Sequence, residues 1–224
     1  MASNLGRPVE DRSVHIPVGS AILEGDLNIP AGAGAIVLFA HGSGSSRHST
    51  RNRFVAGPLR QAGLATLLVD LLTDEEERID ARTRRYRFDI EMLAHRLVAA
   101  TDWLVKYPDT QGLDIGCFGS STGAAAALVA AKERPEAIHS VVSRGGRPDL
   151  AAEVLGEVRA PTLLIVGGKD TSVLELNEQA LMRMLTEKQL EIVPGATHLF
   201  EEEGALDKVA ILAREWFVAH LGST

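Results

Sequence analysis

The sequence lacks most of the features that mark secreted, membrane and nucleic-acid-binding proteins. It has one cysteine, Cys117, so no disulfide can form within the chain. It has no run of eighteen apolar residues, so no transmembrane helix is expected, and residues 1–13 contain no apolar signal-peptide core. Its net charge is −7, whereas a nucleic-acid-binding face is basic. We therefore expect a cytoplasmic protein without a membrane or nucleic-acid partner.

Motifs for metal ions and nucleotide cofactors are missing as well. The sequence contains neither H-E-x-x-H nor a Cys/His pair with zinc spacing. Gly42 and Gly44 lack the third glycine of a dinucleotide fingerprint, and Gly32-x-Gly34 precedes a strand instead of following one. Residues 168–170 lack the Ser or Thr and the upstream glycine of a P-loop. The sequence thus predicts no cofactor and no metal.

Short apolar runs alternate with helix-like segments from residue 35 onward. An antiparallel hairpin at residues 14–29 precedes them. This alternation predicts βαβ crossovers and a parallel sheet. The chain has 224 residues and no interdomain linker or repeat, so we expect one α/β domain, residues 1–224, with residues 1–12 loosely ordered. The all-apolar run at residues 35–40 has the length of a strand buried on both faces, and residues 65–70 form the next buried strand. Further strands are expected at residues 113–118, 137–143, 162–166 and 189–193.

The helix-like segments are less uniform than the strands. A long amphipathic helix is expected to follow the charged stretch at residues 73–87 and to end before Pro108. Asp149 is placed to cap a short helix. The remaining helices are expected at residues 53–62, after the strand that ends near residue 118, at 173–186 and at 205–221.

Residues 113–127, LDIGCFGSSTGAAAA, organise the rest of the chain. A β-prone run ends at Gly119, and an alanine-rich helix begins near Gly123. Gly119-x-Ser121-x-Gly123 matches the nucleophile elbow, in which a serine occupies a sharp turn between a strand and a helix. Glycine is needed on both sides because a Cβ there would collide with the neighbouring strand or helix. Ser121 is therefore the candidate nucleophile, and an ordinary Gly/Ser turn is the alternative.

Two later strand ends offer the partners that a serine nucleophile requires. His198 follows the last strand and is the only one of the seven histidines placed after a late strand end. Asp170 follows the preceding strand, where it would bind the imidazole N–H and fix its tautomer, although it could also cap the next helix. Reactive residues of an open parallel sheet lie at the carboxyl ends of its strands. We therefore expect Ser121, Asp170 and His198 to meet there.

The loop after the first buried strand, HGSG at residues 41–44, is a candidate part of an oxyanion hole. Such a hole takes one backbone N–H from this loop, here Ser43, and one from the residue after the nucleophile, here Thr122. His41 and Gly42 are candidate substrate-binding residues. Arg144, which leaves the strand beside the elbow, is another, and an equal alternative is that it holds its own glycine loop.

A group of arginines occupies the charged stretch at residues 73–87. They form either a solvated face that balances the acidic residues 74–77 or a border of the pocket that attracts anionic substrates. The sequence leaves both interpretations open. The five arginines are Arg78, Arg82, Arg84, Arg85 and Arg87.

With these motifs in place, the chain resembles the dienelactone-hydrolase-like branch of the α/β-hydrolase superfamily over residues 14–221. FAHGSGSSRHS, FGSSTGAAAAL, VVSRGGRPDL and IVPGATHLFEE are especially similar to small hydrolase domains that are sometimes fused to phosphoribosyltransferases. The resemblance implies a mostly parallel sheet of about eight strands without a large cap domain, and esterase activity on small esters or lactones. Dienelactone hydrolases proper use a cysteine nucleophile, so Ser121 favours generic carboxylester hydrolysis.

The sequence-based hypothesis is a serine esterase that cleaves a small-molecule ester through an acyl-enzyme. An acyltransferase or a peptidase would use the same three residues. A noncatalytic module that serves a partner, such as a phosphoribosyltransferase, is an alternative from another class. A homodimer is left open.

Overall fold

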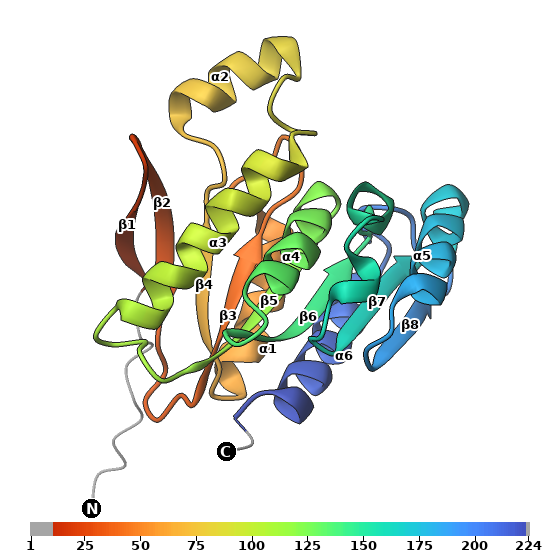
Figure 1. Ribbon diagram of the computed structural model, residues 1–224. Helices are drawn as coiled ribbons and strands as arrows, with labels where there is room; N and C mark the ends of the chain where they lie inside the picture. The colour runs from red at the N-terminus through yellow and green to blue at the C-terminus, as the bar shows by residue number, and fades with distance from the viewer. Residues whose placement is uncertain (1–10, 223–224) are drawn as a thin grey trace, which may run out of the picture.

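The computed structural model describes residues 11–222 as a single α/β unit built on an eight-stranded sheet (Figure 1). The strand order is β1-β2-β4-β3-β5-β6-β7-β8, in which β1 and β2 are antiparallel to their neighbours and β3 to β8 are parallel. The expected hairpin, parallel sheet and strand number are confirmed. The strands are β1 (Arg12–Val18), β2 (Ala21–Asn28), β3 (Ala35–Ala40), β4 (Ala65–Val69), β5 (Asp114–Ser120), β6 (Ile138–Arg144), β7 (Thr162–Gly167) and β8 (Lys188–Val193).

Helices cover both faces of the sheet. α3, α4 and α5 lie on one face, and α1 and α6 pack together on the other (Figure 1). Two short 3-10 turns, Pro148–Ala151 and Leu155–Glu157, follow β6. The helices are α1 (Thr50–Gln61), α2 (Asp74–Thr83), α3 (Ile90–Lys106), α4 (Thr122–Glu133), α5 (Thr171–Arg183) and α6 (Ala205–His220).

The central strands are buried on both faces because they are apolar throughout. In β3, whose six residues are all buried, Leu38 packs into the core under α3 and α4, and Phe39 packs into the core under α1 and α6. Phe118 of β5 joins Phe39 in the second core, with ring centroids 4.9 Å apart. Cys117, also in β5, is fully buried, as expected.

The structure differs from the predicted helix starts at two places, and side-chain hydrogen bonds explain both differences. α1 begins at Thr50, three residues earlier than predicted, because the Ser49 side chain accepts a hydrogen bond from the Asn52 N–H. Asp149 does not cap a helix. It lies within a 3-10 turn, and its carboxylate binds the Arg147 guanidinium at 2.7 and 2.8 Å.

The predicted loosely ordered segment, residues 1–12, includes two residues that are docked in the structure. Residues 1–10 lie outside the described residues. Asp11 and Arg12 are docked instead, since Asp11 binds Arg60 and Arg12 binds Asp109, each at 2.9 Å, and Arg12 begins β1. These ion pairs join residues distant in the sequence, so no local pattern indicated them.

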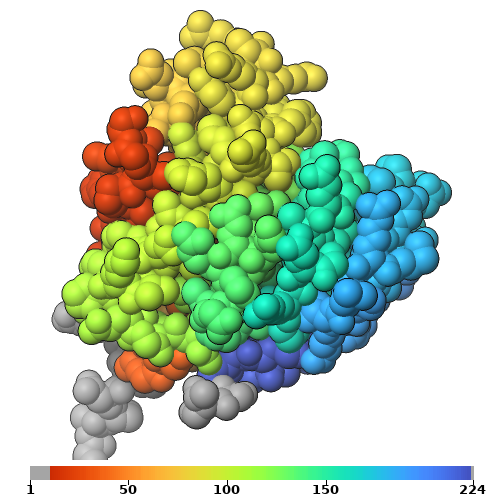
Figure 2. Space-filling view, in the orientation of Figure 1, coloured from red at the N-terminus to blue at the C-terminus, as the bar shows by residue number. Residues whose placement is uncertain are grey.

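The charged stretch after β4 contains a helix that the sequence analysis did not assign. Thr73 and Glu76 form a capping box at the start of α2. Asp80 is the only buried residue of this helix. In the space-filling view the yellow segment that contains α2 protrudes from the body (Figure 2). No helix among residues 11–222 combines the length and apolarity needed to cross a membrane.

Candidate active site

The turn between β5 and α4 has the backbone of a nucleophile elbow. Ser121 has a positive φ, with φ 51° and ψ −121°, a strained combination that a residue other than glycine rarely adopts. A Cβ at Gly119 would lie 2.7 Å from the Ala124 nitrogen, and one at Gly123 would lie 2.5 Å from the His41 oxygen. Both distances are shorter than real Cβ contacts, so the strand, the turn and the helix can approach this closely only with glycine.

The loops after β7 and β8 bring Asp170 and His198 together. His198 Nδ1 lies 2.6 Å from Asp170 Oδ2, and the carboxylate is mostly buried. Asp170 occupies the N-cap position of α5 but makes no side-chain capping bond. Its carboxylate is therefore directed at the imidazole and not at the helix. This contact places a proton on Nδ1 and leaves Nε2 as the basic nitrogen.

The last residue of β6, Arg144, and the loop that follows it, residues 145–147, lie between Ser121 and His198. The Ser121 N–H donates to the Arg144 oxygen at 3.3 Å, and the Arg147 N–H donates to the Ser121 oxygen at 3.1 Å. On the other side of the loop, a Cβ at Gly145 would lie 3.5 Å from His198 Nδ1. Within residues 11–222 the Ser121 hydroxyl has no hydrogen-bond partner. Catalytic hydrogen bonds are often long without substrate and tighten when it binds.

A carboxylate that the sequence analysis did not assign holds the loop of His198. Both oxygens of Glu202 accept from the Thr197 N–H at 3.1 Å. Hydrogen bonding to the side chain and then to the backbone of Thr197 lowers the pKa of Glu202. Phe200, two residues after His198, has a φ of 56° and is fully buried. A left-handed phenylalanine carries backbone strain, which the surrounding packing must hold in place. No sequence signal marks Phe200.

The two predicted oxyanion-hole residues lie side by side. Ser43 Oγ donates to the Arg87 oxygen at 3.1 Å and lies 3.0 Å from Thr122 Oγ1. A hydroxyl has one proton, so Thr122 donates to Ser43 in this chain of bonds. A Cβ at Gly42 would lie 3.0 Å from the Ser121 Cβ, which shows how closely the loop after β3 approaches the elbow. The side chains therefore fix the loop beside the start of α4.

An ion-pair network anchors the far end of the same loop. The Arg47 N–H and guanidinium both bind Asp70, which follows β4. Arg47 also binds Glu24 at 2.8 Å and lies 3.4 Å from Asp26, both on β2. The side chain of Arg47 is mostly buried among these carboxylates. No local sequence pattern marks Arg47, because its partners lie in β2 and directly after β4.

The His41 side chain is buried and bonded to the backbone, and it is not presented to a substrate. Its Nδ1 lies 2.9 Å from the Gly42 oxygen, and its Nε2 accepts from the Leu71 N–H at 2.9 Å. These bonds require a proton on Nδ1 and none on Nε2, so the ring is neutral. Burial lowers the pKa of His41, against the raising effects of the Gly42 bond and of nearby Asp70 and Glu77. Both ring nitrogens are thus used by the backbone.

The other serine of the elbow points away from the turn. Ser120 is buried, and its hydroxyl donates to Asn52 Oδ1 of α1 at 3.2 Å. Arg144 lies opposite Ser120 in the pairing of β5 with β6 and is buried too, at 8 % exposure. Its guanidinium lies 5.9 Å from the centre of the Phe200 ring. Arg144 therefore lies beneath the loop of His198, where its role as a substrate contact stays a prediction.

The arginines of the charged stretch do not behave as one group. Arg87 binds the buried carboxylate of Asp80 at 2.7 Å, and its backbone oxygen accepts from Ser43. Burial would raise the pKa of Asp80, yet hydrogen bonds from Tyr86 and Arg87 lower it. Arg78 donates to the Asp74 oxygen at the helix surface. Arg87 thus borders the site, whereas Arg82, Arg84 and Arg85 are exposed.

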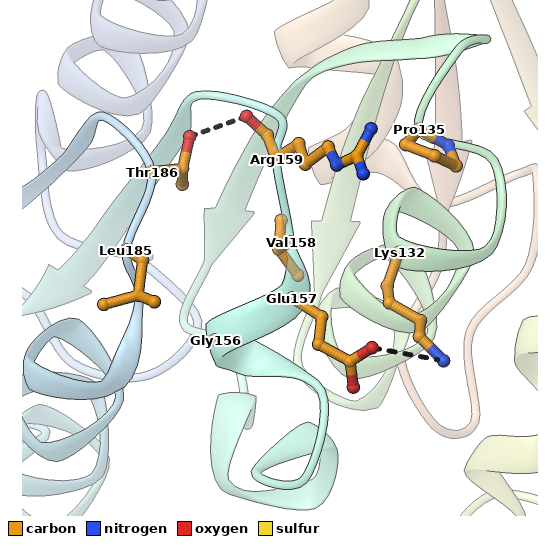
Figure 3. Close-up of a pocket in the computed structure, with 8 residues that line it drawn as sticks. All are labelled: Lys132, Pro135, Gly156, Glu157, Val158, Arg159, Leu185 and Thr186. Carbon is orange, nitrogen blue, oxygen red and sulfur yellow. Dashed lines mark hydrogen bonds and ion pairs between the residues drawn. The ribbon is translucent and has the colours of Figure 1, made fainter.

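A cavity of about 510 Å³ lies at the opposite edge of the sheet, near the amino ends of β7 and β8 (Figure 3). Lys132 and Glu157 form an ion pair of 3.8 Å across it, and Thr186 donates to the Arg159 oxygen at 2.6 Å. No histidine or serine lines this cavity. Within residues 11–222, no group of three or more His, Cys, Asp or Glu side chains is placed to hold a metal ion.

The strand order, the elbow turn and the facing loops define an α/β hydrolase. Residues 24–216 match the family model named dienelactone hydrolase family. The chain belongs to the dienelactone hydrolase family.

Solved structures agree with this assignment. The crystal structure of a dienelactone hydrolase from Anabaena variabilis is 62 % identical, with a TM-score of 0.94, and the match covers 96 % of this chain and 100 % of that one. Est1E from Butyrivibrio proteoclasticus has a TM-score of 0.76 at 16 % identity, covering 92 % and 98 % of the two chains, which shows a shared fold.

A curated relative from Mycobacterium tuberculosis is longer than this chain. It is 56 % identical over 214 residues and is provisionally named a phosphoribosyl transferase. The match covers 96 % of this chain and 47 % of the relative. The chain thus spans about half the length of that relative.

Proposed function

We propose that this hydrolase cleaves small carboxylic esters or lactones, with Ser121 as nucleophile, His198 as general base and Asp170 as the residue that orients the imidazole. The observation that carries the proposal is the 2.6 Å contact between His198 and Asp170 beside a strained Ser121. A serine on this turn presents its hydroxyl at the sheet edge, and the His–Asp contact leaves Nε2 free to take its proton.

In the first half of the reaction, Ser121 Oγ attacks the ester carbonyl while His198 Nε2 takes the serine proton. The imidazolium that forms lies against the Asp170 carboxylate, which stabilises its charge. Negative charge develops on the carbonyl oxygen, and the N–H groups of Ser43 and Thr122 bind it. The C–O bond to the alcohol then breaks, and the alcohol leaves with the proton from His198.

In the second half, water replaces the alcohol. His198 takes a proton from water, the hydroxide attacks the acyl-enzyme, and the same N–H groups hold the second oxyanion. Collapse of this intermediate breaks the bond to Ser121 Oγ, which recovers its proton from His198. The products are an alcohol and a carboxylic acid. With an alcohol or an amine in place of water, the same steps would transfer the acyl group, which product analysis detects.

The test compares the two serines of the elbow. Ser121→Ala should lower turnover of p-nitrophenyl acetate by at least about 10³-fold, because the nucleophile is lost. Ser120→Ala is the matched control, since Ser120 is equally near in sequence but donates to Asn52. It should retain activity within about tenfold. Unchanged turnover in Ser121→Ala would rule out the proposed mechanism, and it would favour a noncatalytic role or another nucleophile.

A further inference from the structure

Arg144 carries a buried charge without an acceptor. It is the last residue of β6 and lies on the face that α1 and α6 cover, together with Val142. Its Nε and Nη1 are buried, and within residues 11–222 neither has a hydrogen-bond partner. Guanidinium groups buried in proteins are usually paired with carboxylates, because an uncompensated buried charge is costly.

The charged residue near Arg144 is a second arginine, Arg51, and not an acidic residue. Arg51, in the first turn of α1, has a buried Nε that also lacks a partner in the described part of the chain. Among residues 11–222 its only ion pair is with Glu201, at 3.4 Å, and the Glu201 side chain is 66 % exposed. Burial and then the charge of Arg51 lower the pKa of Arg144 to about 10. Arg144 therefore keeps its charge at neutral pH, and the charge of Arg51 opposes it.

The backbone adds positive potential at the same place. Asn52, which follows Arg51 in α1, accepts a hydrogen bond from the Ser120 hydroxyl. Ser120 in turn lies opposite Arg144 in the pairing of β5 with β6. The first turn of α1 therefore lies over the ends of these two strands. This turn contains no acidic residue. The N-terminus of a helix carries a partial positive charge that favours anions. Two guanidinium groups and a helix end thus lie near one another, and the described part of the chain supplies no buried anion to compensate them.

Other buried arginines of this chain show that the arrangement is unusual. Arg96, at 6 % exposure, binds both oxygens of Glu76 at 2.5 and 2.6 Å. Arg47, whose Nε also lacks a hydrogen bond, binds Asp70, and Arg87 binds Asp80. Arg144 differs from these three because, within residues 11–222, it has no carboxylate partner, and this indicates a site for a negative group that comes from outside the chain.

We propose that Arg144, Arg51 and the first turn of α1 form a subsite for an oxyanion, a carboxylate or a phosphate, beside the candidate nucleophile. The Arg144 oxygen accepts from the Ser121 N–H, and Phe200, which covers the guanidinium, lies two residues after His198. An ester with an anionic group would therefore reach both the nucleophile and the subsite. This substrate preference rests on the proposed function, whereas oxyanion binding does not.

Binding is tested on the Ser121→Ala protein, so that turnover plays no part. Calorimetric titration with inorganic phosphate should show one saturable site. Arg144→Gln and Arg51→Gln, each made in this background, should weaken it at least about tenfold. Arg214→Gln, on the exposed surface of α6, is the matched control and should leave the affinity unchanged. Absence of saturable binding, or binding that both site variants leave intact, would overturn the subsite.

Thermal unfolding separates a ligand-binding arginine from one that stabilises the fold, because replacing the two kinds should shift Tm in opposite directions. In phosphate-free buffer Arg144→Met should raise Tm by about 2–4 °C, because it replaces an unpaired buried charge with an apolar side chain. A lower Tm would mean that Arg144 stabilises the free protein, against the proposal. If Arg144 variants do not fold, Arg51→Gln still decides the binding test, since Arg51 is partly exposed.

Kinetics identify the source of the anion. The wild-type protein should prefer p-nitrophenyl hemisuccinate over p-nitrophenyl butyrate, and Arg144→Gln should reduce this preference at least about tenfold through the hemisuccinate reaction. Competition between phosphate and hemisuccinate would assign the subsite to the substrate, and phosphate binding without competition would assign it to a free ion. If Ser121→Ala stays active, the proposed function fails, while the phosphate titration still judges the subsite.

Discussion

The elbow and α2 are stabilised in different ways. Nine of the twelve residues of α4, the helix after the elbow, are buried, most of them alanine. In α2 the only buried residue is the carboxylate of Asp80. The elbow is held by close backbone packing around Gly119 and Gly123, whereas α2 is held by ion pairs.

This difference indicates what each region can do. Close packing has one arrangement, so the elbow is expected to be rigid, which suits a preorganised nucleophile and oxyanion hole. A helix with few apolar contacts opens at a low free-energy cost. Ser43, in the loop after β3, donates to the backbone oxygen of Arg87, and Arg87 in turn binds Asp80 of α2. Opening of α2 would therefore loosen the loop after β3, which contains Ser43, without unfolding the sheet.

The largest effect is expected from Gly123→Ala. Its Cβ would collide with the backbone of Ala40 and His41, so the free energy of unfolding should fall by about 3 kcal/mol or more. Urea unfolding measures the loss. Gly57→Ala in α1 is the control, since no atom lies within 4 Å of the added Cβ, and it should leave the protein as stable or slightly more stable. Equal effects of the two substitutions would contradict the close-packed elbow.

A smaller and local effect is expected from Asp80→Asn. The change weakens the hydrogen bonds that Asp80 accepts from the Arg87 guanidinium and from the N–H groups of Arg87 and Tyr86. The free energy of opening α2 should fall by about 1–3 kcal/mol. Trypsin should then cleave after the arginines of residues 82–87 faster than in the wild type. Glu75→Gln, an exposed change on the same helix, should leave the cleavage rate unchanged. Uniform cleavage along the whole chain would argue against an independently opening α2.

Mild acid should affect the elbow side before α2. Burial lowers the pKa of His41 below its ordinary value of 6.5, so in mild acid the unfolded chain binds a proton that the folded chain does not. This stability is complete above about pH 7 and falls, by at most about 1.4 kcal/mol per pH unit, as the pH drops below 6.5. Glu76 and Asp80, whose pKa values are also lowered, lose their contributions only at more acidic pH, near and below the ordinary carboxyl values.

Urea unfolding at pH 7.5, 6.5 and 5.5 measures this loss. The His41→Gln variant should show a flatter dependence on pH over the same range, because it has no ring to protonate. An identical slope in the two proteins would mean that another group causes the loss.

The smallest effect is expected at Cys117 in the Asp80→Asn protein. Burial raises the pKa of this thiol to about 12, so it reacts only when the sheet opens. If α2 opens by itself, the labelling rate of Cys117 should stay within about threefold of wild type, while Gly123→Ala accelerates it strongly. Rapid labelling in Asp80→Asn would show that α2 and the sheet open together.

The same contrast explains how much the sequence predicts. The sheet, the elbow and the pairing of His198 with Asp170 follow from local patterns and from the rule that reactive residues follow the carboxyl ends of parallel strands. The Arg47 network, the bond from Ser43 to Arg87 and the cover of Phe200 over Arg144 join residues that are distant in the sequence, so no local pattern indicates them. The place of His41 in the HGSG loop predicts a substrate contact, but both ring partners of His41 are backbone groups, which a sequence does not display.

The most direct test of the account is to identify the residue that a fluorophosphonate labels in the folded protein. Mass spectrometry of the digested adduct should find one phosphonate on Ser121, and His198→Ala should slow its formation by about 10²-fold or more, because the base is lost. A label on Ser120 or Ser43, or no label on the folded protein, would contradict the central claim that Ser121 is an activated nucleophile.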